Sequence, residues 1–323
     1  MKRTKAGPDC QILFPVFGGE MVTAKIQTVK SLRVEIFSRT LQKNATRPLT
    51  VWIVGTDSRT GIAFRNWAWY NFLQYKPINR NLIERDLPMK IRCIWEHNGN
   101  DSILYAENFI GAFTRGSSKD LAIQKMPVEI KSYLMWKGSL IPDSFEIEIV
   151  QEKQSNLTIS DADSDVLFDE ERKELSSFEY ADLKALALKS AQDFLTLYQS
   201  IPDKDKSRVP VRTTFYGQIP RTAFEMYLHT KNVNDYYFGE IGVSTNNEGS
   251  ILECRERGFA VLESQPDFLK NAVCLGSYNE EWSLRKVLRR FIWHDRIHAK
   301  AMYRMAVKTF GSHAVPNVFL FDI

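Results

Sequence analysis

The stretch WSLRKVLRRFIWHDRIHAKAMYRMAVKTF, residues 282–310, decides the fold of the second half of the chain. Its apolar side chains recur every three or four residues, which is the spacing of one α-helix face: Leu284, Val287, Leu288, Phe291, Met302 and Met305. His294 and His298 fall on the same face four residues apart, so both imidazoles are expected to point together into the interior. The basic residues of this helix are expected on the opposite, exposed face: Arg285, Lys286, Arg289, Arg296, Lys300 and Arg304.

A second helix is predicted over residues 221–240, and it carries another histidine on its inner face. His229 lies between Met226 and Val233 on that face. A histidine pair on one helix and a single histidine on a facing helix can build a metal site inside a bundle. Three imidazoles leave one coordination position open, as in catalytic zinc sites. The sequence therefore predicts a divalent metal site at His229, His294 and His298. The alternative is that each is a hydrogen-bonded core histidine, since buried polar groups need partners.

Length and composition set broad limits. The 323 residues are 44% hydrophobic and 25% charged, which is typical of a globular protein with two or three domains. The net charge of +4 is small and favours no class of partner. The four cysteines form no CxxC pair, which is typical of a reducing compartment. No apolar run approaches the length of a membrane span and no secretory signal is evident, so the chain is expected to be cytoplasmic and free of membrane partners.

Residues 1–88 are a basic region of undefined role. A strand is predicted over residues 49–54, and an aromatic cluster follows at residues 64–72. The loop at residues 55–61 lacks the Lys-Ser/Thr pair of a phosphate-binding P-loop, and no nucleic-acid-binding signature accompanies the basic residues. The sequence therefore does not favour a nucleic-acid partner. An alternative is that translation begins at Met89, in which case residues 1–88 are not part of the native protein.

Residues 89–150 are predicted to form a small α/β module. Ile91, Cys93 and Trp95 alternate with polar residues ahead of a turn at residues 98–101. Strands are expected over residues 103–107 and 109–114, then a helix over about 117–136 and a last strand over 145–149. The stretch from Ile110 to Gly116, followed by the helix that ends Tyr133-Leu134-Met135-Trp136, resembles the HicB-like fold. That resemblance implies a binding or accessory role. His97 is expected at the surface beside the turn.

An acidic linker is predicted over residues 151–175, because six carboxylates fall between residues 161 and 171 and the glycine of a calcium loop is missing. Residues 176–323 are predicted as four helices, beginning near Ser177, Arg221, Ser250 and Trp282, in which Gly258 allows a close helix contact. The expected fold class is therefore α+β and multidomain, with a small α/β module followed by an all-α four-helix bundle.

The stretch His294-Asp295-Arg296-Ile297-His298 has the outline of the HExxH motif of zinc proteases. Aspartate replaces the glutamate that serves as the general base in those enzymes. The only later histidine that could supply a third ligand is His313, near the end of the chain. These departures argue against a metalloprotease.

Residues 176–323 resemble the DinB-like four-helix bundle superfamily, which includes YfiT-type metal hydrolases and the bacillithiol and mycothiol S-transferases of bacteria. The resemblance lies in the helix around His229 and in the stretch Trp293-His294-Asp295-Arg296-Ile297-His298. In that family one histidine of the second helix and an HxxxH pair of the fourth helix bind a divalent metal. The match carries over to His229, His294 and His298.

The resemblance implies a bound metal that activates water or a small thiol for hydrolysis or transfer. Zinc, nickel, iron and manganese all accept imidazole ligands, so the metal is left open. A non-enzymatic metal-binding or stress-related interaction protein is the alternative, which leaves open whether the chain is an enzyme at all. A homodimer is compatible with the family, although no interface is predicted. Asp295, Glu225 and Tyr236 are the candidates for orienting a ligand imidazole.

Overall fold

The computed structural model describes residues 88–214 and 217–323 in full and five short strands before them. The chain divides into two compact units, Met1–Asn81 and Leu82–Ile323. In the first unit an antiparallel sheet joins β1 (Cys10–Val16), β2 (Glu20–Ile26) and β3 (Val34–Ile36), and a second pairs β4 (Val54–Thr56) with β5 (Ala63–Arg65). Of the strand predicted over residues 49–54 only Val54 is described. Of the predicted aromatic cluster only Phe64 is described, as part of β5, and its other members lie outside the described residues.

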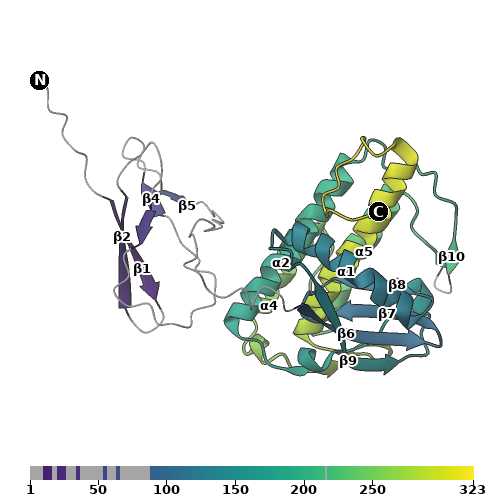
Figure 1. Cartoon of the computed structure of the whole chain (residues 1–323), viewed down its shortest axis with the longest axis horizontal. Coiled ribbons are helices and arrows are strands. Elements are labelled where there is room, and N and C mark those ends of the chain that lie inside the picture. The colour runs from purple at the N-terminus through teal and green to yellow at the C-terminus, as the bar shows by residue number, and fades with distance from the viewer. Residues whose placement is uncertain are drawn as a thin grey trace, which may run out of the picture. The chain divides into compact units, whose positions relative to one another are not determined.

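The second unit begins with a mixed sheet in the order β8-β7-β6-β9 (Figure 1). Strands β6 (Met89–Asn98), β7 (Asp101–Ala106) and β8 (Phe113–Gly116) are antiparallel neighbours, and α1 (Lys119–Lys137) leads to β9 (Phe145–Gln154), which lies parallel to β6. Ser118 begins α1 by accepting a hydrogen bond from the backbone N–H of Leu121, and Gly138 ends it with a left-handed backbone. The module was predicted with these elements in this order.

The strand predicted over residues 109–114 is too long at its start. Residues 107–112 form a turn in which the Ala112 N–H bonds the Phe109 carbonyl, and β8 begins at Phe113. Gly111 has a φ of 93°, and a Cβ at this position would lie 2.3 Å from Cγ2 of Ile292. The turn therefore depends on a glycine that lets the sheet approach the last helix closely.

Four helices follow: α2 (Ser177–Ser200), α3 (Ala223–Gly239), α4 (Ile251–Glu263) and α5 (Leu284–Phe310). Going round the group, α2 packs on α4, α4 on α3, α3 on α5 and α5 on α2. Short elements join them, including β10 (Thr213–Thr214), β11 (Gly217–Gln218), η3 (Phe268–Lys270), β12 (Cys274–Leu275), η4 (Ser277–Asn279) and β13 (Glu281–Trp282). Gly258 of α4 lies against the ring of Phe238, which confirms the predicted close contact.

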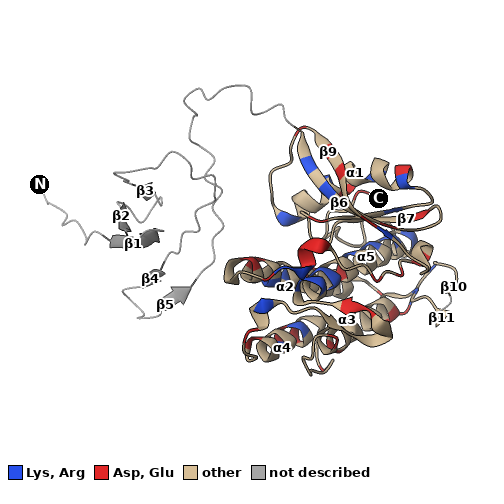
Figure 2. Ribbon diagram, turned by 90° about the horizontal axis from the view of Figure 1, so that it is seen from below, with Lys and Arg blue, Asp and Glu red and all other residues tan. Residues whose placement is uncertain are grey.

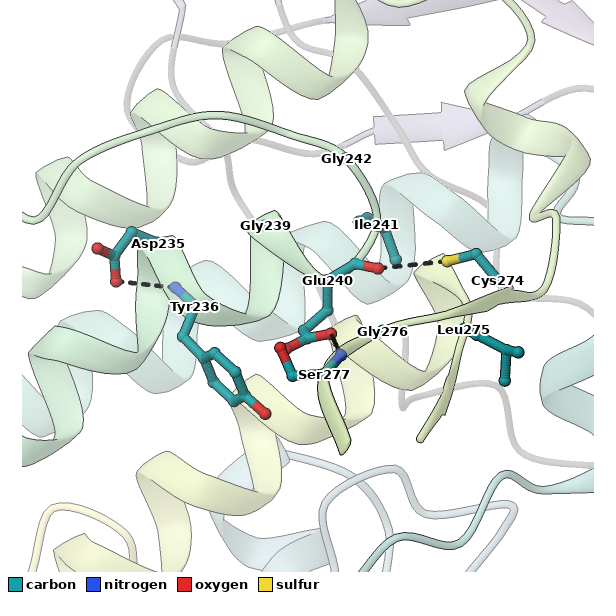
Figure 3. A pocket seen from close by; sticks show the side chains of 10 residues that line it. All are labelled: Asp235, Tyr236, Gly239, Glu240, Ile241, Gly242, Cys274, Leu275, Gly276 and Ser277. Atoms are coloured by element: carbon teal, nitrogen blue, oxygen red, sulfur yellow. Dashed lines mark hydrogen bonds between the residues drawn. The ribbon is translucent and has the colours of Figure 1, made fainter. Parts of the chain in front are cut away.

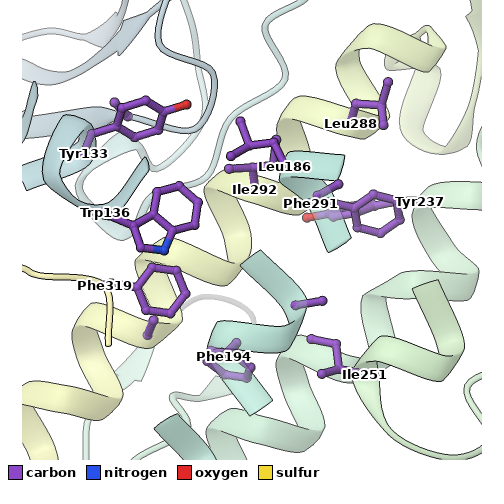
Figure 4. Close-up of a cluster of buried hydrophobic side chains, with 14 of the residues drawn as sticks. Tyr133, Trp136, Leu186, Phe194, Tyr237, Ile251, Leu288, Phe291, Ile292 and Phe319 are labelled. Carbon is purple, nitrogen blue, oxygen red and sulfur yellow. The ribbon is translucent and has the colours of Figure 1, made fainter. Parts of the chain in front are cut away.

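The sheet and the helices share one interior. Tyr133 and Trp136 of α1 belong to the same buried cluster as Phe194 of α2 and Phe291 of α5 (Figure 4). A second cluster lies on the other face of the sheet, where Trp293 of α5 meets the rings of Tyr105 and Phe113 at 6.0 and 5.9 Å. The helix α5 therefore contributes to both clusters, and Leu82–Ile323 is a single unit rather than a module joined loosely to a bundle.

The expectation that the basic face of α5 is exposed is wrong, because of its six residues only Arg304 is exposed, while Arg285 and Lys300 are half-buried and the other three are buried. The side chains of Lys286, Arg289 and Arg296 are only 0%, 1% and 1% exposed. Arg289 pairs with Glu171 at 2.5 Å and Arg296 with Glu129 at 2.6 Å. Because the sheet, α1 and the segment before α2 cover this face, the cations lie in the interior and are balanced there by buried carboxylates.

The segment over residues 151–175 also differs from the expected solvated linker. Its first residues complete β9, and two 3-10 turns follow, η1 (Ile159–Asp161) and η2 (Asp169–Arg172). Val166 and Phe168 are buried against the sheet, and Glu171 is buried with Arg289. Of the acidic residues in this segment, Glu171 neutralises a buried cation of α5, Arg289.

In the described residues, no helix is long and apolar enough to cross a membrane. Along the ribbon of the second unit, positions of lysine and arginine alternate with positions of aspartate and glutamate in the helices and the sheet (Figure 2).

Candidate metal centre

Local capping fixes where the two histidine-bearing helices begin. Thr222 accepts a hydrogen bond from the backbone N–H of Glu225, whose carboxylate accepts the backbone N–H of Thr222 in return. This capping box starts α3 seven residues before His229. Ser283 starts α5 by accepting the backbone N–H of Lys286. Both helices pack against each other, so their inward residues meet.

The three predicted histidines come together between α3 and α5. Nε2 of His294 lies 3.1 Å from Nε2 of His298. The ring of His229 lies 5.1 Å from that of His294 and 4.6 Å from that of His298. One nitrogen from each ring can be chosen so that all three lie within 4.8 Å of one another. The structure thus brings together all three residues that the sequence proposed as ligands.

The spacing of His294 and His298 fits two nitrogens that share one cation. Two nitrogens that each lie about 2.1 Å from an ion are about 3.0 Å apart at a right angle and about 3.4 Å apart at the tetrahedral angle. The 3.1 Å between His294 and His298 falls within that range. The nitrogen of His229 would have to come closer for all three to share one ion, since the set as a whole lies within 4.8 Å. Imidazole nitrogen also suits the borderline divalent metals.

Partial loss of hydration favours the neutral form of these imidazoles, which is the form that binds a metal. Desolvation lowers the pKa of His294 well below 6.5, and the nearby His298 and His229 lower it further. Desolvation, followed by the charge of His229 and that of Arg115 in β8, lowers the pKa of His298 to about 3. Desolvation also lowers the pKa of His229. All three rings are therefore unprotonated at neutral pH.

The cluster opens to solvent on one side. His294 is buried and His298 is half-buried, whereas His229 is exposed. A small molecule can therefore approach from the side of His229 on α3, whereas the ring of Tyr237 packs 5.9 Å from that of the buried His294. Such an arrangement suits a site that exchanges a ligand rather than one closed for structural purposes.

None of the three predicted orienting residues hydrogen-bonds an imidazole among the described side chains. Asp295 is fully buried and makes two hydrogen bonds with the Arg255 guanidinium, at 3.0 and 3.1 Å. The Glu225 carboxylate caps α3, and Tyr236 lies nearer the end of that helix. Nδ1 of His294 is buried without a partner. Packing by neighbouring rings, rather than a carboxylate, therefore holds this ligand.

Arg255 was missed by sequence reasoning, although a signal existed. It lies on the buried face of α4 with Cys254, Gly258 and Phe259. Its guanidinium reaches Asp295, the Ala187 carbonyl and Asn234, and Ser190 donates a hydrogen bond to the same aspartate at 2.5 Å. A basic residue inside an apolar stripe indicates a buried carboxylate partner. Asp295 is therefore occupied in joining α5 to α2 and α4, unlike the glutamate of HExxH.

The other two histidines of the second unit lie outside the cluster. His97, expected at the surface beside a turn, is half-buried in β6: its ring stacks on Trp95 at 4.0 Å, and it contacts Glu152 of β9 at 3.2 Å. His313 follows the end of α5 and is exposed. Because both lie outside the cluster, replacing either one provides a control for metal binding at the three histidines.

Comparison with known proteins identified no relative. No family model, no curated protein and no solved structure matches the chain. The functional argument therefore rests on the residues and on the geometry of the cluster.

Proposed function

We propose that the second unit is a metal-dependent enzyme of the DinB-like type, with a divalent cation held by His229, His294 and His298. The observation that carries this proposal is the convergence of three neutral imidazoles from two helices beside an open, solvent-facing side. The sequence resemblance and the packing of four helices around this point support the same assignment. Zinc, nickel, iron and manganese all remain compatible with the three nitrogens.

The reaction proposed is activation of a small thiol or of water for transfer or hydrolysis. A bound divalent cation lowers the pKa of a thiol or water ligand and so supplies a nucleophile near neutral pH. The chain's own contribution is to hold the three imidazoles unprotonated and to leave one side open. Tyr237 and Trp293 pack beside His294 and limit its movement. In this scheme the sheet and α1 form the accessory, HicB-like part.

Thiol capture can be tested with the cobalt-loaded protein. Co(II) replaces zinc in nitrogen sites and gives visible absorption that responds to its ligands, so addition of 2-mercaptoethanol should add a sulfur-to-cobalt charge-transfer band. His294→Ala should show neither the cobalt absorption nor the sulfur-to-cobalt band, and His313→Ala should behave as the parent. A cobalt spectrum that ignores thiol but changes with pH near neutrality would favour activation of water. A parent that binds no cobalt would contradict the proposal.

The second candidate is a non-enzymatic metal-binding or interaction protein, related to stress response. One observation favours it: among the described residues no carboxylate hydrogen-bonds any of the three imidazoles, and Asp295 is paired with Arg255. A site without an orienting carboxylate or a nearby general base is poorly equipped for proton transfer. In that case the protein would bind cobalt, but its spectrum would change with neither thiol nor pH.

A further inference from the structure

A cleft of about 770 Å³ lies at the C-terminal end of α3, away from the three histidines (Figure 3). Its buried carboxylate, Glu240, accepts hydrogen bonds from the backbone N–H of Ser277 at 2.7 Å and from the hydroxyl of Tyr236. None of the side chains that line it holds a buried polar atom without a partner. The cleft therefore offers no group that a ligand is needed to satisfy, whereas one edge of the sheet leaves a row of backbone groups unpaired.

That edge is formed by the ten-residue strand β9 (Figure 1). In the order β8-β7-β6-β9 it pairs with β6 and with no other described strand. Within the described part of the chain, residues 145–154 make no further backbone hydrogen bond. About half of the N–H and C=O groups of such a strand point away from its neighbour. They form an open edge about 33 Å long, which can pair with another strand.

A bulge places charges of opposite sign on one face of β9. The register with β6 shifts in the middle of the strand, so that Val150 has no residue opposite it. Glu146, Glu148 and Lys153 all pair with even-numbered residues of β6, and these share one face because side chains alternate along a strand. Without the extra residue, Lys153 would lie on the opposite face. This face therefore carries two carboxylates in the first half of β9 and an ammonium group in the last.

These charges are available for contacts with another molecule. Glu146 and Glu148 are exposed, and the side chain of Lys153 is 43% exposed. Glu146 forms no ion pair among the described side chains. The ion pairs of Glu148 with Lys90 and of Lys153 with Asp165 are long, at 3.9 and 3.8 Å, and lie at the surface. Such pairs contribute little and can be shared with a new partner.

Two copies of this edge are complementary to each other. Hydrogen-bonded strands related by a two-fold axis run antiparallel, so the first half of one β9 lies beside the last half of the other. Glu146 and Glu148 of each copy would then lie opposite or diagonal to Lys153 of the other, on the same face of the joined sheet. Charged residues usually keep an edge strand unpaired, but in this arrangement they attract one another.

Apolar side chains beside β9 support the same pairing. Leu140 and Ile141, a few residues before the strand, are 75% and 44% exposed. In the antiparallel arrangement they lie near the residues that follow β9 in the other copy, among which Leu157 is half-buried. Contact between them would remove apolar surface from water and add to the backbone hydrogen bonds.

We propose that β9 is a self-association surface, through which two copies of the chain join their sheets by antiparallel β9–β9 pairing. The partner is thus a second copy of this chain. An edge contact of this kind is smaller than a standard protein interface, so we expect a dimer that dissociates at about micromolar concentrations. The pairing does not require a metal at the histidines.

Sedimentation velocity of the full chain over a range of concentrations tests the pairing. Lys153→Glu places like charges beside Glu146 and Glu148 of the other copy, and the double variant Glu146→Lys/Glu148→Lys does so beside Lys153. Each should weaken dimerisation by about tenfold or more. An equimolar mixture of the two should dimerise as the parent does, because opposite charges meet again. Lys131→Glu on the exposed face of α1 is the matched control, and it and His294→Ala should behave as the parent.

Three results would overturn the proposal. They are a parent that stays monomeric at about 0.1 mM, charge variants that dimerise like the parent, and a mixture that does not recover dimerisation. Amide hydrogen exchange gives a separate check, since protection of β9 should rise with protein concentration. Protection already present in the monomer would show that another segment of the same chain covers the edge, and would also overturn it. Metal content is measured separately, so failure here leaves the proposed function standing.

Discussion

Asp295 lies between His294 and His298 in sequence but faces away from them in the structure. Its carboxylate, with Arg255 and Ser190, forms a fully buried polar cluster between α2, α4 and α5. Such a pair adds little net stability compared with apolar residues, yet breaking it leaves an uncompensated buried charge. The HxxxH spacing could be read from sequence, whereas the direction of Asp295 could not, because that direction depends on which helix packs on each side of α5.

Replacing Asp295 with asparagine should lower the free energy of unfolding by about 3–5 kcal/mol, since the Arg255 charge would remain buried without its partner. Metal content per folded molecule should be unchanged. Urea unfolding measures the first quantity, and Asp267→Asn, which removes an exposed ion pair with Lys270, should cost less than about 1 kcal/mol. A large loss of metal in folded Asp295→Asn would show that the aspartate acts on the site.

Stability of the metal-free protein should fall as the pH drops below about 6.5. His298 has its pKa lowered to about 3 in the folded state against 6.5 in the unfolded chain, so the unfolded chain binds the extra proton between these values. Between pH 6 and 4 the free energy of unfolding should therefore change less steeply in His298→Gln than in the parent, by about 1.4 kcal/mol per pH unit. Urea unfolding at several pH values measures this slope, and parallel slopes would contradict the lowered pKa.

At the scale of elements, the sequence predicted the helices correctly but not what packs against each of their faces. Periodicity identified α2 to α5 and the close contact at Gly258, because amphipathic spacing reports which face of a helix is buried. It failed on Arg289 and Arg296, since α5 is buried on two sides and its charged face has the sheet and α1 rather than water opposite it. The covering carboxylates lie in η2 and α1, more than a hundred residues earlier in the chain, so local patterning could not pair them with α5.

Gly258→Ala should destabilise the protein although alanine favours helices more than glycine does. The added Cβ would lie 2.0 Å from the ring of Phe238, so α3 and α4 must move apart, at a cost of about 1–3 kcal/mol. Gly239→Ala is the matched control: no atom lies within 4 Å of its added Cβ, and the change should be neutral or stabilise by up to about 1 kcal/mol. Thermal unfolding compares the two, and equal melting temperatures would contradict the close packing.

For the whole molecule, the module and the bundle that were predicted as separate domains belong to one compact unit. Residues 151–175 were expected to separate two domains, but they carry Phe168 and Glu171 into the contact between sheet and helices. Sequence patterning identified the α+β class because it reports the type and order of elements. It could not show that the two parts share a core, because that depends on contacts between residues far apart in the chain.

The unit Leu82–Ile323 should therefore unfold in a single transition. Circular dichroism follows the helices, and tryptophan fluorescence follows rings on both sides of α5 once Trp52, Trp67 and Trp69 of the first unit are replaced by phenylalanine. The two signals should give the same urea midpoint. Trp293→Ala should shift both midpoints together, with a loss of about 3–5 kcal/mol, because it opens a cavity between the sheet and α5. Two separate transitions would indicate independent domains.

The central claim is that His229, His294 and His298 hold one divalent cation, and elemental analysis of the untagged protein tests it most directly. The parent and His313→Ala should each carry close to one equivalent of a divalent metal. His229→Ala, His294→Ala and His298→Ala should each lose it while remaining folded by circular dichroism. A folded parent that takes up no metal when zinc, nickel, iron and manganese are supplied in turn would contradict the claim.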